Sequence, residues 1–489
     1  MSKPAKTSPE YDMRAALSEI GMTVKAVNVV GRPMFWSRTG NADVLRTYRD
    51  ACVEFSNIGW YGDMGRWIAA FPVWQRSISR KSYEGIEFRP QPPCVADRGR
   101  ANFVNSWRGW SVKPRQGGHY DKLIDLARYG MCQESESLFD WFWAYLAHSV
   151  QRPEKLPGTA IVMYGNQGVG KNTVFDAIAS LCRDHSIEVT TEEQLTGRFT
   201  SHLCNQLYVL SDEATYSRSR AALGRLKALI TSPTLAVEEK GKPIYTTRNC
   251  TRLFIATNND EAFPAAIGER RSAVFKFSDV YKEDQTFFSQ LRSELENGGR
   301  EALLYDLLHA DLSALPNPTV IPKTQALVEQ QVFALDSVTS FALDSLESGQ
   351  LVREAEHKYD CMWPEHVAIS DLWSSYLRHT IEGKYRYQAS SSRTMLKQLA
   401  PLLGLSTESR TKWMRGSDGE NRKPKTRQVP TLEEAATAFE EATGIATDIS
   451  TSDCGESAPP VDYEADEFVT PVDFSALHNS TGKTGVNNG

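Results

Sequence analysis

Lys171 ends a glycine-rich segment of the kind that binds phosphate groups. An apolar run, residues 159–164, leads into Gly165-Asn166-Gln167-Gly168-Val169-Gly170-Lys171-Asn172-Thr173, and a helical pattern follows. Glycines let the main chain approach phosphate oxygens, and N–H groups of the loop and of the helix N-terminus attract negative charge. We therefore predict that residues 165–173 form a P-loop that binds ATP, with Lys171 on the β- and γ-phosphates. The simpler alternative is a glycine-rich turn with a chance lysine.

Asn172 departs from the usual P-loop pattern, which has serine or threonine after the lysine. That hydroxyl normally ligates Mg²⁺, so either the amide oxygen of Asn172 or the hydroxyl of Thr173 is expected to replace it. Asp212 is the third expected Mg²⁺ ligand. It follows an apolar strand pattern, residues 205–211, and Glu213 stands beside it. In this position Glu213 would act as the general base for the attacking water.

Two further segments carry polar residues that suit phosphate chemistry. Residues 251–257 form a third strand pattern, and Asn258 follows it, where its amide could hydrogen-bond the γ-phosphate or the attacking water. Arg270 and Arg271 come next, and either could stabilise charge on the γ-phosphate of a neighbouring subunit. Arginine pairs are also common on protein surfaces, so an ordinary exposed pair is the simpler alternative for Arg270 and Arg271.

The order of these motifs resembles that of the superfamily 3 helicases, which are compact hexameric AAA+-type ATPases of viruses, phages and plasmids. Within this superfamily, the chain looks most like the helicase portion of phage and virus primase–helicase proteins. The resemblance covers residues 158–281 and, more loosely, residues 102–157. It implies that Lys171 is the Walker A lysine, that Asp212 and Glu213 form Walker B, and that Asn258 is the sensor. Arg270 or Arg271 would be the finger that acts in trans.

The same resemblance implies a nucleic-acid contact. Residues 235–246 alternate in polarity and are broken by Gly-Lys-Pro, which indicates a hairpin whose tip carries Lys240 and Lys242. In the helicases such a hairpin projects into the central channel and follows single-stranded DNA, and RNA is not excluded. Lysines suit phosphate contacts without base preference. A hexamer, and a separate primase or polymerase, are the other partners implied.

A primase site is not evident in residues 1–150. Primer synthesis would need two acids flanking one residue at a strand end, with a downstream His or Asp. Only Asp50 and Glu54, in a helix-like stretch, and Asp63 stand out. We therefore expect no metal-dependent primer synthesis by this chain.

Composition sets the class of protein. Of the 489 residues, 40% are hydrophobic and 24% charged, and no apolar run approaches the ~18 residues of a membrane helix. The eight cysteines form no CxxC pair, which favours a reducing, cytoplasmic location without disulfides or zinc. Residues 432–489 hold 12 acids against one lysine, so the rest of the chain is mildly basic. A nucleic-acid partner is compatible with this charge.

We expect an α/β fold in which a P-loop AAA+-type ATPase core lies between other parts. The expected order is a flexible arm (residues 1–20), an aromatic-rich α+β N-terminal region (21–115), a helical collar and linker (116–157), the ATPase core (158–284), a helical extension (285–350), a helical C-terminal domain with a basic segment (351–430), and an acidic, mostly disordered tail (431–489). Helical patterns at residues 371–379 and 393–403, with the basic residues 410–427, indicate either a winged helix or a plain three-helix cap, and residues 432–443 are one more short helix candidate.

The function predicted from these features is an ATP-driven, ring-forming DNA helicase for replication of a phage or other mobile element. The first alternative is a P-loop ATPase that grips DNA without unwinding it, such as an initiator, a loader or a packaging motor. The second is a non-catalytic adaptor, which only Asn172 favours.

Overall fold

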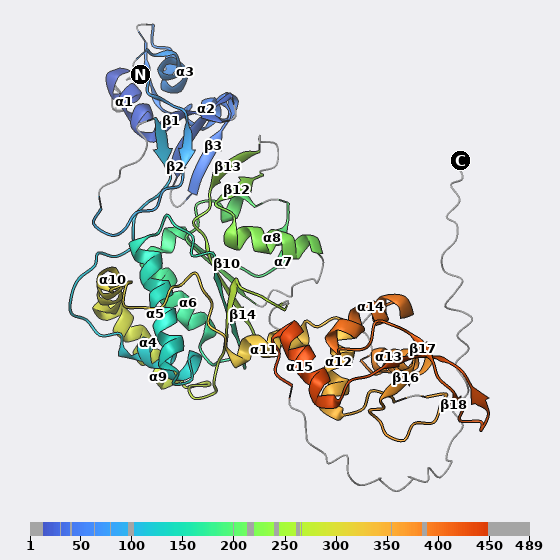
Figure 1. Cartoon of the computed structure of the whole chain (residues 1–489). Coiled ribbons are helices and arrows are strands. Elements are labelled where there is room, and N and C mark those ends of the chain that lie inside the picture. Colours follow the sequence, from blue (N-terminus) through green and yellow to red (C-terminus); the bar gives the residue numbers. More distant parts are fainter. Residues whose placement is uncertain are drawn as a thin grey trace, which may run out of the picture.

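A five-stranded parallel sheet forms the centre of the chain, with other parts on either side of it (Figure 1). The computed structural model describes residues 13–29, 31–39, 42–62, 64–78, 80–95, 102–198, 200–212, 220–238, 244–260, 265, 267–353, 355–383 and 389–447.

The central sheet has the strand order β10-β11-β14-β9-β15, and every neighbouring pair is parallel. Its strands are β9 (Ala160–Tyr164), β10 (Ser186–Val189), β11 (Tyr208–Asp212), β14 (Arg252–Thr257) and β15 (Ser272–Lys276). The order places β14 between β9 and β11. All three strands predicted from apolar runs are therefore confirmed, and their carboxyl ends share one edge of the sheet.

Helices cover both faces of this sheet, which explains why its strands are continuously apolar. Alternate residues of β9 point to opposite sides: Ile161 and Met163 enter one core cluster, while Val162 and Tyr164 enter another. The first face is covered by α4 (Asp121–Asp125), a π-helical turn (Leu126–Met131), α5 (Glu136–Gln151), α6 (Lys171–Ala179), α9 (Gln285–Glu294) and α10 (Arg300–His309). The second is covered by α7 (Glu192–Thr196), α8 (Arg220–Thr231) and α11 (Gln325–Phe333).

The N-terminal region contains both helices and strands, with its own core clusters, but Phe88, Trp107 and Trp110 pack against the core of the central sheet instead. Its sheet has the order β3-β2-β1-β6. The elements are α1 (Met13–Thr23), β1 (Val24–Val29), β2 (Arg32–Thr39), β3 (Ala42–Arg46), α2 (Tyr48–Glu54), β4 (Gly59–Tyr61), β5 (Trp67–Ala69), α3 (Ala70–Arg76), β6 (Ser82–Tyr83), β7 (Gly85–Glu87) and β8 (Phe103–Asn105). The flexible-arm prediction is wrong for residues 13–20, because Ala16 and Ile20 of α1 are buried in this unit's core.

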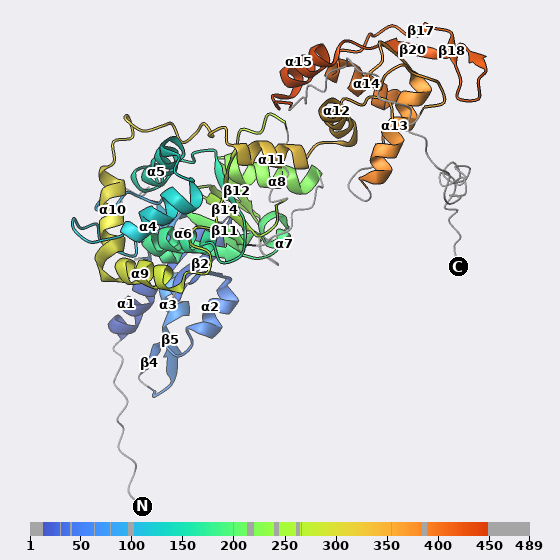
Figure 2. The same ribbon diagram turned by 90° about the horizontal axis from the view of Figure 1, so that it is seen from below.

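The C-terminal part builds its own core around Phe341, Tyr376 and Phe439. A three-stranded antiparallel sheet, β16-β20-β17, joins its helices. The elements are α12 (Ser337–Ser348), β16 (His366–Ala368), α13 (Ile369–Glu382), α14 (Ser392–Leu402), β17 (Arg410–Thr411), β18 (Met414–Arg415), β19 (Asn421–Arg422), β20 (Lys425–Gln428) and α15 (Leu432–Thr443). In two views this part lies beside the central sheet, with α11 between them (Figures 1 and 2).

Candidate functional site

Residues 165–170 form a loop whose backbone conformation favours glycine at three positions. Gly165, Gly168 and Gly170 have φ of 140°, 80° and 101°, where L side chains are strained. A Cβ on Gly165 would lie 3.1 Å from the carbonyl oxygen of Phe277, and one on Gly170 would lie 2.9 Å from the ring of Phe288. Gly170 is also the N-cap of α6. The strand, loop and helix therefore follow one another as the sequence predicts.

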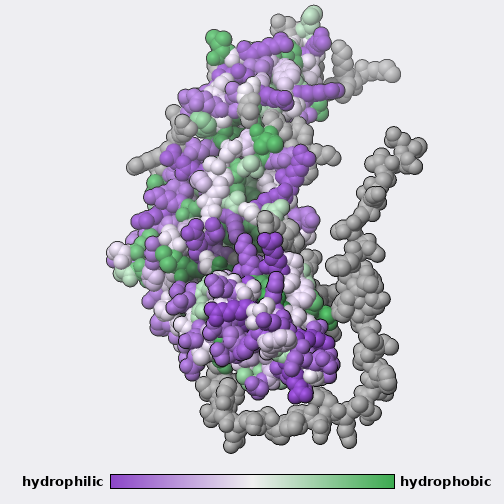
Figure 3. Space-filling model, turned by 45° about the vertical axis from the view of Figure 1, so that its right-hand side comes forward, coloured by the Kyte–Doolittle hydropathy of each residue, from purple (hydrophilic) through white to green (hydrophobic). Residues whose placement is uncertain are grey.

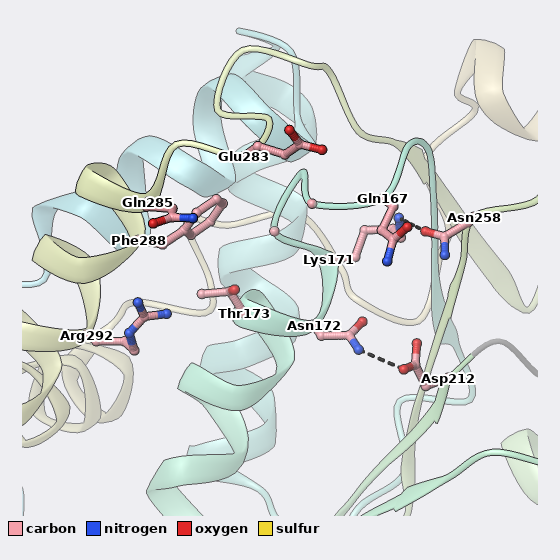
Figure 4. Close-up of a pocket in the computed structure, with 12 residues that line it drawn as sticks. Gln167, Lys171, Asn172, Thr173, Asp212, Asn258, Glu283, Gln285, Phe288 and Arg292 are labelled. Carbon is pink, nitrogen blue, oxygen red and sulfur yellow. Dashed lines mark hydrogen bonds between the residues drawn. The ribbon is translucent and has the colours of Figure 1, made fainter.

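Lys171 begins α6 and turns its amine back over this loop. Its side chain is buried, and Nζ donates hydrogen bonds to the carbonyl oxygens of Gly165 (2.8 Å) and Asn166 (2.7 Å). A third bond, of 2.8 Å, reaches Oδ1 of Asn258. Because β14 lies next to β9, the residue after β14 meets the loop after β9. Two residues that are 87 positions apart are thus joined directly (Figure 4).

Asn172 lies beside Asp212. Its amide Nδ2 donates to Oδ2 of Asp212 at 2.8 Å, whereas Thr173 lies on the other side of α6, near Phe288 (Figure 4). This arrangement distinguishes the two residues that the sequence left open. Glu213, the expected general base, lies outside the described residues.

Lys171, Asn172, Asp212 and Asn258 share one open pocket of about 620 Å³. Its lining also includes Gln167, Gly168, Gly170, Thr173, Glu283, Gln285, Phe288 and Arg292. Asn166 and Val169, also predicted here, support the loop instead: Asn166 Nδ2 donates to both carboxylate oxygens of Asp279 at 2.9 and 2.8 Å, and Val169 is buried.

One wall of this pocket was missed by sequence reasoning. Glu283, Gln285, Phe288 and Arg292 lie in or just before α9, beyond the last predicted motif. Their spacing is that of any amphipathic helix, so no sequence signal marked them. Phe288 presents an aromatic ring and Arg292 an exposed guanidinium, the groups that suit a nucleobase and a phosphate or ribose.

Carboxylates crowd the Asp212 side of the pocket. Burial, and then the charge of Asp212, raise the pKa of Asp176 on α6 above its usual value. Burial followed by the charges of Asp212 and Asp176 likewise raises the pKa of Glu188 on β10. Repulsion of this kind favours a cation at this edge.

The residues present fit Mg²⁺ in the form in which ATP carries it. Asp212 offers a carboxylate and the neighbouring Asn172 an amide oxygen, whereas the hydroxyl of Thr173 lies toward Phe288, and oxygen is the donor that Mg²⁺ prefers. Among the described residues there is no group of three His, Cys, Asp or Glu side chains that could hold a metal. Mg²⁺ is commonly held by one or two carboxylates together with substrate phosphates, so this donor set is compatible with it.

Arg270 and Arg271 lie far from this pocket within the chain. They precede β15, whose first residue, Ser272, pairs with Ala160 at the start of β9. The P-loop follows the opposite end of β9. Arg270 is exposed, whereas Arg271 is only partly exposed. Within one chain, both arginines therefore lie at the end of the sheet opposite to the pocket.

The predicted hairpin is confirmed in its strands. β12 (Thr234–Val237) pairs antiparallel with β13 (Tyr245–Arg248), Thr234 facing Arg248 and Val237 facing Tyr245. Lys240 and Lys242, at its predicted tip, lie outside the described residues. Tyr245 packs against a core cluster of the N-terminal region that contains Trp36.

Comparisons with known proteins find a family of unknown function and a phage protein that are similar to this chain. A family of unknown function (DUF5906) matches residues 163–271. The chain is 25% identical over 279 residues to a DNA primase-polymerase of Nitratiruptor phage NrS-1, a match that covers 55% of this chain and 38% of that protein. It is thus homologous to a phage primase-polymerase but spans well under half of its length.

Solved structures of the C-terminal region of NrS-1 share the fold. One apo structure of residues 305–718 has a TM-score of 0.57 at 17% identity and covers 87% of this chain and 100% of that one. An A-form apo structure gives 0.56 at 16% identity with the same coverage. The mixed α/β fold with its parallel sheet is therefore that of the NrS-1 C-terminal region.

Within the described part of the chain, no helix combines the length and the apolar character needed to cross a membrane.

Proposed function

We propose that this chain is an ATP-driven, ring-forming DNA helicase of superfamily 3 type that acts in phage DNA replication. The observation that carries the proposal is the convergence of Lys171, Asn258 and the Asn172–Asp212 pair in one pocket. The ends of three strands supply them, and β14, which precedes Asn258, lies between β9 and β11. The homology to a phage DNA primase-polymerase supports the setting, DNA replication in a host cytoplasm.

The pocket residues divide the work of binding and hydrolysis. Lys171 and the loop N–H groups bind the phosphates, while Phe288 takes the nucleobase. Lys171 would exchange its bonds to the carbonyls of Gly165 and Asn166 for phosphate oxygens, which are anionic and hold the amine more strongly. Mg²⁺, bound with ATP between Asp212 and the amide oxygen of Asn172, would neutralise phosphate charge.

Hydrolysis then depends on residues at the rim of the site. Asn258 orients the attacking water while it holds Lys171, and Glu213 accepts the proton of that water. Arg270, the more exposed of the two arginines, would reach the γ-phosphate bound to the next subunit. A closed ring, a hexamer by the resemblance, would bring the two sites together and place Lys240 and Lys242 on the central strand.

A hydrolysis assay with matched variants tests the site. Lys171→Ala and Glu213→Gln should each reduce ATP hydrolysis stimulated by single-stranded DNA by at least ~100-fold, the scale on which single catalytic groups act. Lys113→Ala, which removes an exposed lysine elsewhere in the same part of the chain, should leave it unchanged. Near-normal turnover in either site variant would refute the assignment.

A second assay tests the nucleic-acid contact. Lys240→Ala combined with Lys242→Ala should weaken stimulation of ATP hydrolysis by single-stranded DNA and spare ATP binding. Unchanged stimulation would count against the channel role.

Electron microscopy tests the assembly. A negative-stain image with ATP and single-stranded DNA should show a six-membered ring.

The alternative is an ATPase that grips DNA without unwinding it. A forked-duplex unwinding assay separates the two, because only the helicase converts ATP hydrolysis into strand release. Primer synthesis is not proposed for this chain. Its likeness is to the C-terminal region of the relative, and residues 1–150 offer no primase pattern, so a separate primase or polymerase would act alongside it.

A further inference from the structure

The face of α14 that points away from its domain's core carries positive charge and small residues. Met395 and Leu399 are buried in the core, and Arg393 and Lys397 lie on the opposite side of the helix. A groove of about 570 Å³ runs along this outer side. It is lined by Arg393, Leu396, Lys397, Ala400, Pro401, Gly404, Leu405, Thr407 and Arg427, and thus by three cations and no acid.

The strands beside α14 extend this basic surface. β17 and β20 pair antiparallel, and the chain between them, residues 412–424, forms an arm that contains the small hairpin β18–β19. Residues 404–430 hold seven Lys or Arg against three acids. The exposed cations are Arg410, Lys412, Arg415, Arg422, Lys423 and Lys425. Of the acids, Asp418 is already paired with Arg422. In Figure 3, which brings this side forward, hydrophilic residues dominate the lower part of the surface.

One large aromatic ring stands out on this arm. Trp413 is 67% exposed, and the amine of Lys423 lies 5.9 Å from the centre of its ring. Trp413 lies at the start of the arm, between β17 and β18, and the part of its apolar surface that stays in water gains nothing from folding. Next to phosphate-binding cations, it offers a flat face on which a base can stack.

We propose that the C-terminal domain binds duplex DNA, with α14 in the major groove, the arm on neighbouring phosphates and Trp413 stacked on the base pair at a fork. The order α12, β16, α13, α14, β17, β20 is a helix–strand–helix–helix–hairpin arrangement, the winged form of a helix-turn-helix in which the second helix of the pair enters the groove. The groove beside α14 is lined in part by Ala400, Pro401 and Gly404, whose small size allows close approach to base edges. This site is independent of the proposed ATPase activity.

Binding assays on the full chain without nucleotide test the surface. Fluorescence anisotropy would compare a blunt 20-base-pair duplex, a fork and a single strand of the same sequence. Arg393→Glu with Lys397→Glu should weaken duplex binding at least ~10-fold and reduce its dependence on salt. The charge-matched control Arg49→Glu with Lys113→Glu, both exposed in other parts of the chain, should bind as the wild type does. Equal loss in the control, or none in the α14 variant, would overturn the proposal.

Two further comparisons identify the ligand. Double-stranded RNA should bind more weakly than DNA, since its deep, narrow major groove excludes a helix; equal binding would contradict the placement of α14. Poly-glutamate that displaced the duplex at equal charge would reassign the surface to an acidic protein segment and overturn the proposal.

Trp413 has its own readout. Trp413→Ala should reduce the preference for a fork over a blunt duplex about 10-fold, within the range for loss of one stacked base. Trp413→Phe, which keeps an aromatic ring, should retain most of that preference. If the wild type, Trp413→Ala and Trp413→Phe all prefer the fork equally, Trp413 does not stack at the junction.

Discussion

Lys171 and Arg252 are two buried cations at opposite edges of the same sheet, and only one of them faces a pocket. Lys171 follows the carboxyl end of β9, where its amine bonds two main-chain carbonyls and Asn258. Arg252 starts β14 at the amino edge and is completely buried. Its Nη1 donates to the carbonyls of Pro153 and Cys250, both at 2.7 Å, and its Nη2 to those of Arg152 and Lys155, at 3.0 and 2.7 Å.

The surroundings decide what each cation can do. Three of the four carbonyls around Arg252 belong to the C-cap of α5 and to the linker after it, so the guanidinium meets the negative end of a helix dipole and closes the linker onto the sheet. All four of these bonds are internal. The partners of Lys171 lie at the edge of an open pocket, where an anion can replace them. The same kind of contact is therefore structural at one edge and available for binding at the other.

The largest expected effect comes from neutralising each cation in turn. Arg252→Met should lower the free energy of unfolding by about 4 kcal/mol, because it leaves buried carbonyls without hydrogen-bond donors. The melting temperature should fall by about 10 °C. Lys171→Met should cost no more than about 1 kcal/mol, because water can reach the carbonyls that it leaves. Thermal denaturation of both variants measures the difference, and equal losses would end the distinction between the two edges.

The next prediction separates positioning of Lys171 from binding. Asn258→Ala removes the hydrogen bond to the lysine amine and, in the proposed mechanism, the group that orients water. ATP hydrolysis should fall about 100-fold while ATP binding changes no more than about 3-fold. Asn259→Ala alters the neighbouring asparagine, which does not line the pocket, and should leave hydrolysis near the wild-type rate. A parallel loss of binding in Asn258→Ala would make this residue part of the phosphate site.

These two edges also differ in how well the sequence predicts them. The P-loop, Asp212 and Asn258 could be identified because their chemistry needs particular residue types at strand ends, in a fixed order along the chain. Arg252 stood within an apolar strand pattern and carried no motif, because its partners are main-chain carbonyls that any residue supplies. Phe288 and Arg292 could not be identified for a different reason. They reach the pocket only because α9 packs against the P-loop.

The prediction of helices from residue spacing was also only partly successful. Helices at residues 371–379, 393–403 and 432–443 were predicted from spacing and correspond to α13, α14 and α15. Helix α1 was missed in residues 1–20, since a short helix gains its stability from tertiary burial, here of Ala16 and Ile20, rather than from local preference.

A smaller, pH-dependent effect is expected at the amino edge. Burial lowers the pKa of His148 to about 4, and the charge of Arg252 adds to this shift. In the unfolded chain the imidazole titrates near 6.5, so between pH 6.5 and 4 the unfolded state binds more protons and stability falls as pH falls. The contribution is about 2 kcal/mol after allowance for partial exposure. Denaturation in urea at several pH values should show a shallower decline in His148→Gln than in the wild type; identical slopes would contradict the assignment.

The smallest predicted effect lies at the carboxyl edge and has the opposite sign. Burial and then the charge of Asp212 raise the pKa of Asp176, so the folded state disfavours this carboxylate. An acid with a raised pKa costs stability once the pH exceeds that raised value, and the cost disappears below the ordinary pKa of aspartate, near 3.9. Asp176→Asn should therefore melt about 2 °C higher than the wild type at pH 8 and equally at pH 3.5.

The stability of Asp176→Asn shows whether the carboxylates near Asp212 repel one another in the folded protein. If Asp176→Asn is less stable than the wild type at pH 8, the carboxylate has a stabilising partner and the crowding around Asp212 is not a cost. If it is more stable, the carboxyl edge keeps a repulsion that is not seen at the amino edge, where both terminal nitrogens of Arg252 are hydrogen-bonded to carbonyls. A site that later receives a cation with its nucleotide has a reason to retain such repulsion, because binding relieves it.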